Sequence, residues 1–308
     1  MAILLYSPND DLLAWRRELL ARRPDLDVRI WPETGDPAQV TMALVWLPPP
    51  GMLAGLPNLG LILSLGAGVD AMLRDTTLPD LPLCRMIDPA LTRSMSEFVL
   101  LHVLKYHRQL DLYAQQQRRG EWSFYLALPA SERRVGIMGL GVLGEDAGRL
   151  LARHGLKVSG WSRTPKTIEG IASFAGEEEL DAFLGELDIL VCLLPLTAET
   201  DSILGTKLFA RLPRGARLIN VARGQHLVEQ DLIDALDTGQ LAHATLDVMR
   251  TEPLPAEHPF WRHPHIDLTP HVASYSLPES GVEIVIENIR RFEAGEPLLH
   301  VVDRGRGY

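Results

Sequence analysis

Residues 134 to 144, Arg134-Val135-Gly136-Ile137-Met138-Gly139-Leu140-Gly141-Val142-Leu143-Gly144, decide the fold of this chain. The apolar run from Val135 is typical of a short buried strand, and the glycines after it fit the pattern G-x-G-x-x-G. An amphipathic run over residues 145–154 predicts a helix, and residues 157–161 predict the next strand. This order of strand, glycine turn, helix and strand predicts a dinucleotide-binding βαβ unit.

Each glycine of this loop has its own expected task. Gly139 permits a tight turn, Gly141 lets the backbone approach a pyrophosphate, and Gly144 lets the helix pack closely on the strand. Val142 and Leu143 of this loop are candidate cofactor-binding residues, and the N-terminus of the helix that follows offers unpaired N–H groups and a partial positive charge to the phosphates. A glycine-rich turn without a ligand is the alternative.

The segment that follows the second strand bears on which dinucleotide binds. An NAD-preferring site usually carries an acid there, about 20 residues after the glycines, to hold the ribose hydroxyls. Residues 161–166 of this chain contain no carboxylate. The hydroxyl of Ser162, the guanidinium of Arg163 and the ammonium of Lys166 suit a 2′-phosphate instead. The sequence therefore predicts NADP(H) as the preferred cofactor, with NAD(H) as the second choice; a solvated basic turn is the alternative.

Composition bounds the class of protein. The length of 308 residues suggests about two domains, and 46% hydrophobic with 23% charged residues is ordinary for a globular protein with a sizeable core. A formal net charge of −10 argues against nucleic acid or a membrane surface as partner, but local arginines can still hold an anionic substrate. Cys84 and Cys192 lie in apolar runs and are expected to pack without a disulfide. Without a basic leader or a long apolar run, we expect a cytoplasmic protein.

The first part of the chain alternates strand and helix patterns, which predicts a small parallel α/β domain. The expected strands are residues 3–6, 28–31, 42–46, 61–65 and 83–86, with a helix over residues 11–22. The fourth strand leads into Gly66-Ala67-Gly68, at the carboxyl end where such folds bind ligands. The N–H groups of this turn are candidates for holding a small carboxylate; a purely structural turn is the alternative.

Residues 92–118 show a helical pattern that is long for one domain, which suggests a crossover between domains or an oligomer contact. The segment that follows, residues 120–130, is irregular and aromatic, with Trp122, Phe124 and Tyr125. Two interpretations stay open: an arm that embraces a second subunit, or a packed surface loop.

Three predicted strands in the second half each end in a polar residue. Strands over residues 217–222, 243–248 and 266–268 lead to Arg223, Asp247 and His271, with Glu252 shortly after Asp247. The remaining elements are a strand at 188–194 and helices at 202–209, 229–238 and 278–294. Because the carboxyl ends of parallel strands meet at one edge of a sheet, we expect these side chains to converge there, although each alone would more often be structural.

Together these residues fit the reduction of a keto acid beside a nicotinamide. Hydride addition leaves charge on the carbonyl oxygen, and histidine, with a reference pKa of about 6.5, supplies a proton readily near neutrality. His271 is then the general acid, and Glu252 orients its ring and favours the charged form. Arg223 offers a planar fork to the substrate carboxylate and carbonyl. Asp247 is a candidate acceptor for the nicotinamide carboxamide.

The chain resembles the D-isomer-specific 2-hydroxyacid dehydrogenases over nearly its full length, and among them the glyoxylate/hydroxypyruvate reductase A group. The matching stretches are residues 45–46, 65–70, 139–144, 195–197, 220–224, 246–248, 252–254 and 269–271. The resemblance implies the roles of Arg223, Glu252 and His271 given above, and oxyacid binding by Ala67, Gly68 and Arg223. It also implies that Leu194 and Pro195, and Val221 and Ala222, line the cofactor.

This resemblance implies two Rossmann-like or flavodoxin-like domains with parallel sheets and an active site in the interdomain cleft. Residues 1–100 with 275–308 are the expected substrate domain, and residues 101–274 the expected NAD(P)-binding domain, on which a homodimer is built. The implied function is NADPH-dependent reduction of small 2-oxoacids, glyoxylate or hydroxypyruvate. The alternatives are a dehydrogenase of a larger D-2-hydroxyacid and a non-catalytic dinucleotide-sensing protein.

Trp46 ends a strand and faces the crevice in the implied fold, where an aromatic wall would restrict the substrate to small 2-oxoacids. Core packing is the alternative for Trp46. His258, His263 and His265 stand in a proline-broken loop without the spacing of metal ligands, so no metal is expected.

Overall fold

The computed structural model describes residues 1–307 and divides the chain into two compact units. Unit 1 is Met1–Leu91 together with the segment that begins at Tyr275, and unit 2 is Thr92–Ser274. The sequence placed the first boundary after residue 100, later than in the structure. The boundary is earlier because helix α3 (Pro89–His107) packs into the core of unit 2 through Met95, Val99 and Val103.

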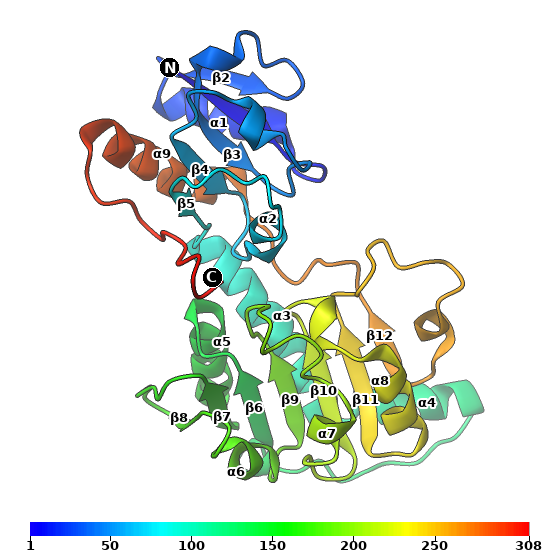
Figure 1. The fold of residues 1–308 in the computed structure, drawn as a ribbon. Coiled ribbons are helices and arrows are strands. Elements are labelled where there is room, and N and C mark those ends of the chain that lie inside the picture. Colours follow the sequence, from blue (N-terminus) through cyan, green and yellow to red (C-terminus); the bar gives the residue numbers. More distant parts are fainter. Residues whose placement is uncertain (308) are drawn as a thin grey trace. The chain divides into compact units, whose positions relative to one another are not determined.

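Unit 1 is built on a parallel sheet with strand order β2-β1-β3-β4-β5 (Figure 1). Its strands are β1 (Ala2–Tyr6), β2 (Asp27–Ile30), β3 (Val40–Val45), β4 (Leu61–Ser64) and β5 (Leu83–Cys84). This is the flavodoxin-like order, in which ligands bind beyond the carboxyl ends of the strands. The predicted alternation of strand and helix in this part of the chain is confirmed.

The two segments of unit 1 meet through their helices. Helix α1 (Leu12–Arg22), which Asp11 caps by accepting from the Ala14 N–H, packs against α9 (Pro278–Ala294). The contact is close, because a Cβ placed on Gly281 would lie 2.7 Å from the Trp15 ring. The predicted closing helix therefore completes the sheet domain that the N-terminal residues begin. A short helix, α2 (Asp70–Leu73), follows β4.

Unit 2 is built on a larger parallel sheet, with strand order β12-β11-β10-β9-β6-β7-β8. Its strands are β6 (Arg134–Met138), β7 (Lys157–Ser162), β8 (Ile171–Ala175), β9 (Ile189–Cys192), β10 (Ala216–Asn220), β11 (Leu241–Leu246) and β12 (Ile266–Leu268). The chain runs outward in one direction from β6 and in the other from β9. The sheet edge above this pair is the switch point at which doubly wound folds bind ligands. Strand β8 was not predicted.

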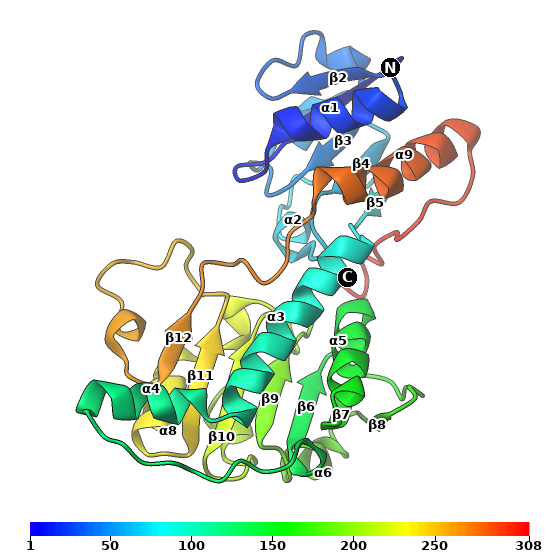
Figure 2. The ribbon, with the colours of Figure 1, turned by 180° about the vertical axis from the view of Figure 1, so that it is seen from behind.

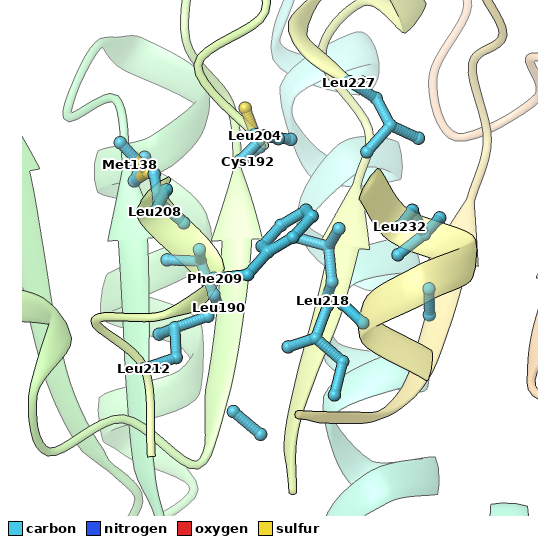
Figure 3. Close-up of a cluster of buried hydrophobic side chains, with 14 of the residues drawn as sticks. Met138, Leu190, Cys192, Leu204, Leu208, Phe209, Leu212, Leu218, Leu227 and Leu232 are labelled. Atoms are coloured by element: carbon cyan, nitrogen blue, oxygen red, sulfur yellow. The ribbon is translucent and has the colours of Figure 1, made fainter. Parts of the chain in front are cut away.

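Helices cover both faces of this sheet (Figures 1 and 2). One face carries α3 and α5 (Val142–Arg153), and the other carries α6 (Leu180–Leu184), α7 (Thr206–Phe209) and α8 (Glu229–Asp237). Figure 3 shows the second layer, where Phe209 and Leu232 of the helices pack on Leu190 and Leu218 of the strands. Burial on both faces explains why the sequences of these strands are continuous apolar runs.

The helical pattern over residues 92–118 forms two helices rather than one. Helix α3 ends at His107, and α4 (Leu110–Arg119) begins after Gln109, whose φ of 59° is left-handed. The buried carboxylate of Asp111, in the first turn of α4, then pairs with Arg217 of β10 at 2.9 Å. The prediction of a continuous helix was wrong because neither glycine nor proline marks the break.

Both cysteines are free and buried, as the sequence predicted. Burial raises the pKa of the Cys84 thiol to about 11 and that of the Cys192 thiol to about 12. Both thiols are therefore protonated packing groups at neutral pH. None of the helices within residues 1–307 combines the length and the apolar character needed to cross a membrane.

Candidate active site

The glycine loop lies at the switch point of unit 2, between β6 and α5. Gly139 has a φ of 103°, and a Cβ there would lie 2.5 Å from the Leu193 carbonyl oxygen. A Cβ on Gly144 would lie 1.8 Å from the Gly139 carbonyl oxygen, so α5 runs directly against the loop backbone. By contrast, a Cβ on Gly141 would meet nothing within 4 Å. Two glycines therefore permit close packing, and the third leaves open space beside the helix N-terminus.

Helix α5 begins at Val142 rather than at residue 145, because Gly141 is its N-cap residue. The N–H groups of Val142, Leu143 and Gly144 thus form the first turn, where backbone donors have no partner within the helix. Val142 is exposed at this end. Open space, unused donors and the positive end of the helix dipole fit a pyrophosphate group.

The turn after β7 presents cations rather than a carboxylate. Ser162 is buried, and its hydroxyl donates to the Thr164 carbonyl oxygen at 2.8 Å, so its proton is used within the turn. Arg163 and Lys166 are exposed. Of the three residues that the sequence assigned to a 2′-phosphate, these two keep charged side chains at the surface of the turn.

A loop beyond β9 faces the same turn. The pKa of Glu199 lies below its ordinary value because of hydrogen bonding, first from the Thr197 hydroxyl, and the charge of Arg163 adds to this lowering. The Thr200 hydroxyl closes the loop by donating to the Pro195 carbonyl oxygen at 2.7 Å and accepting from the Thr197 N–H at 2.8 Å. Leu194 and Pro195, which the sequence assigned to the cofactor, stand at the start of this loop.

The loop beyond β10 carries Val221, Ala222 and Arg223. One Arg223 nitrogen donates to the Ala222 carbonyl oxygen at 2.7 Å, and the Asn220 side chain donates to the Arg223 carbonyl oxygen at 3.1 Å. A Cβ on Gly224 would lie 1.9 Å from the Met249 carbonyl carbon. Only a glycine therefore lets the Arg223 loop rest on the loop that follows β11.

Asp247, at the end of β11, organises the segment that carries His271. Its buried carboxylate accepts hydrogen bonds from the Thr269 hydroxyl at 2.6 Å, the Val272 N–H at 2.8 Å and the Ala273 N–H at 2.9 Å. Its backbone carbonyl accepts from the His271 N–H at 2.8 Å. These bonds hold His271 in a left-handed conformation with a φ of 56°. The sequence proposed a nicotinamide contact for Asp247 and did not identify this supporting role.

His271 and Glu252 are joined by a hydrogen bond of 2.8 Å between Nδ1 and Oε2. The second Glu252 oxygen accepts from the Met249 N–H at 2.8 Å. Burial alone would raise the pKa of Glu252, but the bonds from His271 and Met249 and the charges of His271 and Arg223 outweigh it and lower that pKa. The ionised carboxylate only accepts, so Nδ1 donates to it, and Nε2 is the ring nitrogen that this bond does not use.

In unit 1 the Gly66-Ala67-Gly68 turn follows β4. The Ser64 hydroxyl accepts from the Gly66 N–H at 3.1 Å, and the Met86 N–H donates to the Gly66 carbonyl at 3.0 Å. Within residues 1–307 the N–H groups of Ala67 and Gly68 donate no hydrogen bond. A Cβ on Gly66 would lie 2.3 Å from the ring of Trp46, so the half-buried Trp46 packs directly against this turn.

The structure thus places Arg223, Asp247, Glu252 and His271 at the same edge of the unit 2 sheet as the glycine loop, and Trp46, Ala67 and Gly68 at the carboxyl edge of the unit 1 sheet. His258, His263 and His265 have protein partners in Glu229, Asp237 and Gln115, respectively. In the part of the chain that the structure describes, residues 1–307, no group of three His, Cys, Asp or Glu is arranged to hold a metal.

Sequence reasoning missed two residues of this edge, Gly224 and His226. Gly224 permits the close contact between two loops, and His226 is fully buried with its ring between two backbone carbonyls. The signal for both was their place within three residues of Arg223, just beyond the end of a predicted strand. A lone glycine and a lone histidine carry no spacing that would reveal these partners.

A doubly wound parallel sheet with this glycine loop at its switch point defines a dinucleotide-binding α/β protein, and the His–Glu pair beside an arginine is a candidate acid–base site. The comparisons with known proteins agree with the dinucleotide-binding class. Residues 100–273 match the family model described as D-isomer specific 2-hydroxyacid dehydrogenase, NAD binding domain. The chain belongs to the D-isomer-specific 2-hydroxyacid dehydrogenase family.

Individual relatives match over the full length. The glyoxylate/hydroxypyruvate reductase A of Serratia proteamaculans is 45% identical over 314 residues, covering 100% of both chains. A D-isomer-specific 2-hydroxyacid dehydrogenase of Xanthobacter autotrophicus Py2, solved with NADPH and MES, is 47% identical with a TM-score of 0.96, covering 100% of this chain and 99% of that one. The NADPH-dependent glyoxylate/hydroxypyruvate reductase of Sinorhizobium meliloti, solved with NADP and sulfate, is 39% identical with a TM-score of 0.94, covering 100% of both.

Proposed function

We propose that this protein reduces small 2-oxoacids, foremost glyoxylate and hydroxypyruvate, to 2-hydroxyacids with NADPH. The observation that carries the proposal is the His271–Glu252 hydrogen bond at the sheet edge that also bears Arg223 and the glycine loop. The relatives named as NADPH-dependent glyoxylate/hydroxypyruvate reductases support the choice of substrate and cofactor.

Three residues of unit 2 have separate proposed roles in the reaction. When bound, the reduced nicotinamide supplies a hydride to the keto carbon. His271 donates the Nε2 proton to the carbonyl oxygen, which yields the hydroxyl group, while Glu252 holds the ring through Nδ1. Arg223 neutralises the substrate carboxylate and polarises the carbonyl before the proton moves.

Several groups of the chain fit the dinucleotide and the oxyacid. The N–H groups of the first α5 turn suit the pyrophosphate, and Arg163 and Lys166 suit a 2′-phosphate dianion. Leu194, Pro195, Val221 and Ala222 begin the loops beyond β9 and β10 and are the proposed lining of the cofactor. Asp247 keeps one acceptor position for the carboxamide, because a carboxylate has about four and three are used here.

The turn in unit 1 supplies the proposed carboxylate contact. The N–H groups of Ala67 and Gly68 make no internal hydrogen bond within residues 1–307 and suit an oxyanion. The Trp46 ring beside this turn limits its space, which favours a small acid. The interdomain position of the active site and the cytoplasmic location stay predictions.

A steady-state panel of 2-oxoacids with NADPH and NADH tests this function. We expect kcat/KM to be highest for glyoxylate or hydroxypyruvate with NADPH, and to fall for longer oxoacids. A higher kcat/KM with NADH would contradict the cofactor assignment. NADPH binding without turnover on any oxoacid of the panel would instead indicate a dinucleotide-sensing protein.

The cofactor preference is expected to depend on the exposed cations after β7. Replacing Arg163 and Lys166 together by Ala should raise the KM for NADPH about 10- to 100-fold, because a hydrogen bond to a charged group contributes about 1.5–3 kcal/mol. The KM for NADH should change little, since NADH lacks the 2′-phosphate. Arg153→Ala, which removes one exposed cation at the opposite end of α5, is the control. Equal rises in both KM values would refute the assignment.

We also propose that the protein is a homodimer whose contact includes residues 121–129 of unit 2. This irregular segment exposes apolar side chains, with Trp122 fully exposed and Leu126 at 86%. Contiguous apolar exposure of this kind is typical of a contact with another chain. A second copy is the occupant that the family resemblance implies, which favours the interpretation as an arm over the interpretation as a packed loop.

Replacing Trp122, Phe124 and Leu126 together by Ser should convert the dimer to a monomer, because the exposed apolar surface of the segment is lost. Sedimentation velocity and light scattering measure the mass, with Ser123→Ala as the control in the same segment. A triple variant with the mass of the unaltered protein would rule this segment out as a necessary dimer contact.

A further inference from the structure

His226 is a buried histidine that lies between two loops of the candidate site. It is the last residue of the short 3-10 helix Gly224–His226 that follows Arg223, and its side chain is fully buried. Ring atom Nδ1 lies 2.8 Å from the Thr200 carbonyl oxygen, and Nε2 lies 3.1 Å from the Leu194 carbonyl oxygen. One imidazole therefore spans the two ends of the 194–200 loop, which begins where β9 ends.

The backbone around His226 is anchored to the segment that follows the 194–200 loop and to the core. The Leu204 N–H donates to the His226 carbonyl at 2.8 Å, and the Ser202 N–H donates to the Gln225 carbonyl at 2.9 Å. Leu227, the next residue, packs in the buried cluster with Leu204 and Cys192 (Figure 3). The ring is thus held in place by its own backbone, so its two nitrogens set the positions of the two carbonyls.

The two oxygens that the ring nitrogens face, those of Thr200 and Leu194, are carbonyl oxygens, which only accept hydrogen bonds. A neutral imidazole has one N–H and can satisfy one of them, whereas the doubly protonated ring satisfies both. The Asp201 carboxylate lies nearby, and its pKa is lowered by hydrogen bonding, first from the Ser202 hydroxyl, and by the charge of Arg250. Arg250 donates to the Gln225 and Leu227 carbonyls on either side of His226 and pairs with Asp201 at 3.3 Å.

We propose that His226 is a cofactor-positioning residue, which donates both ring N–H groups and holds the 194–200 loop in the shape that binds the dinucleotide. The inference rests on the proposed function to the extent that this loop lines NADPH. The same turn also carries Arg223, but the two ring bonds of His226 go to the 194–200 loop, which is assigned to the cofactor. Loss of the ring should therefore weaken cofactor binding more than oxoacid binding or the chemical step.

His226→Phe keeps the ring shape and removes both hydrogen bonds. We expect NADPH to bind about tenfold more weakly, the effect of about one net hydrogen bond, with kcat at saturating NADPH and the KM for the oxoacid nearly unchanged. Fluorescence titration of NADPH measures the binding apart from turnover. His226→Gln, whose amide nitrogen carries two N–H groups, should recover part of the affinity. His154→Gln, which removes an exposed histidine bonded to the Leu150 carbonyl, is the control.

A lower melting temperature with unchanged NADPH affinity would overturn the proposal, because His226 would then only stabilise the fold. An equal weakening of NADPH and oxoacid binding would overturn it as well. Nitrogen-15 NMR of labelled histidines in the unaltered protein gives a second readout if His226→Phe does not fold. Two protonated ring nitrogens at His226 are expected, and an unprotonated one contradicts the proposal. Unaltered protein that binds NADPH without turnover would refute the proposed function, but not this role of His226.

Discussion

Replacing His271 by Ala is expected to lower kcat by about 10²- to 10⁴-fold, the usual contribution of a positioned general acid. The developing alkoxide would then have to take its proton from water. NADPH binding should be unchanged, because His271 is assigned to the substrate and not to the cofactor. Single-turnover absorbance of the reduced nicotinamide measures the chemical step, and fluorescence titration measures NADPH affinity.

Glu252→Gln tests how much of the activity depends on the charge of the carboxylate that orients His271. An amide still accepts a hydrogen bond through its oxygen, but it carries no charge to stabilise a protonated ring. We therefore expect a smaller loss of kcat than for His271→Ala. Because the pKa of Glu252 lies below its ordinary value, the unaltered carboxylate is charged near neutrality, and its own titration should not shape the activity profile there. An unchanged kcat in His271→Ala would contradict the proposed role of His271 as the general acid.

The second large effect is expected at Arg223. Removing one partner of a buried, hydrogen-bonded charge pair typically costs about 2 to 5 kcal/mol, so Arg223→Ala should lower kcat/KM roughly 30- to 4,000-fold. We expect KM to rise and kcat to fall, since the guanidinium is assigned to the substrate carboxylate in the ground state and to the carbonyl as charge develops. Steady-state kinetics with glyoxylate, with NADPH saturating, measures the change.

Arg223→Lys tests whether the fork geometry matters beyond the charge. Lysine keeps the positive charge but cannot form two parallel hydrogen bonds to a carboxylate, so most of the loss should remain. Recovery of full kcat/KM by lysine would mean that Arg223 acts only as a point charge. A normal kcat/KM in Arg223→Ala would mean that another residue binds the substrate carboxylate.

Local patterns were enough to predict most of the elements. The glycine loop and the alternating apolar runs predicted both parallel sheets, because strand and helix periodicity is a property of neighbouring residues. They did not predict β8, whose sequence Ile-Ala-Ser-Phe-Ala has little of the apolar continuity of the other strands. The break at Gln109 was missed because a left-handed residue that is not glycine leaves no local signal.

The sequence by itself determined the dinucleotide-binding loop, the absence of a carboxylate after β7, and the strand-end positions of Arg223, Asp247 and His271, since these follow from residue type and short-range order. Only the tertiary structure decided what each side chain touches. It paired His271 with Glu252, used Asp247 to shape the His271 segment, used the Ser162 proton within its own turn, and set the His226 ring between two carbonyls. The physical reason is that a hydrogen bond depends on distances and angles of a few tenths of an ångström between segments far apart in the chain, and no local pattern encodes them.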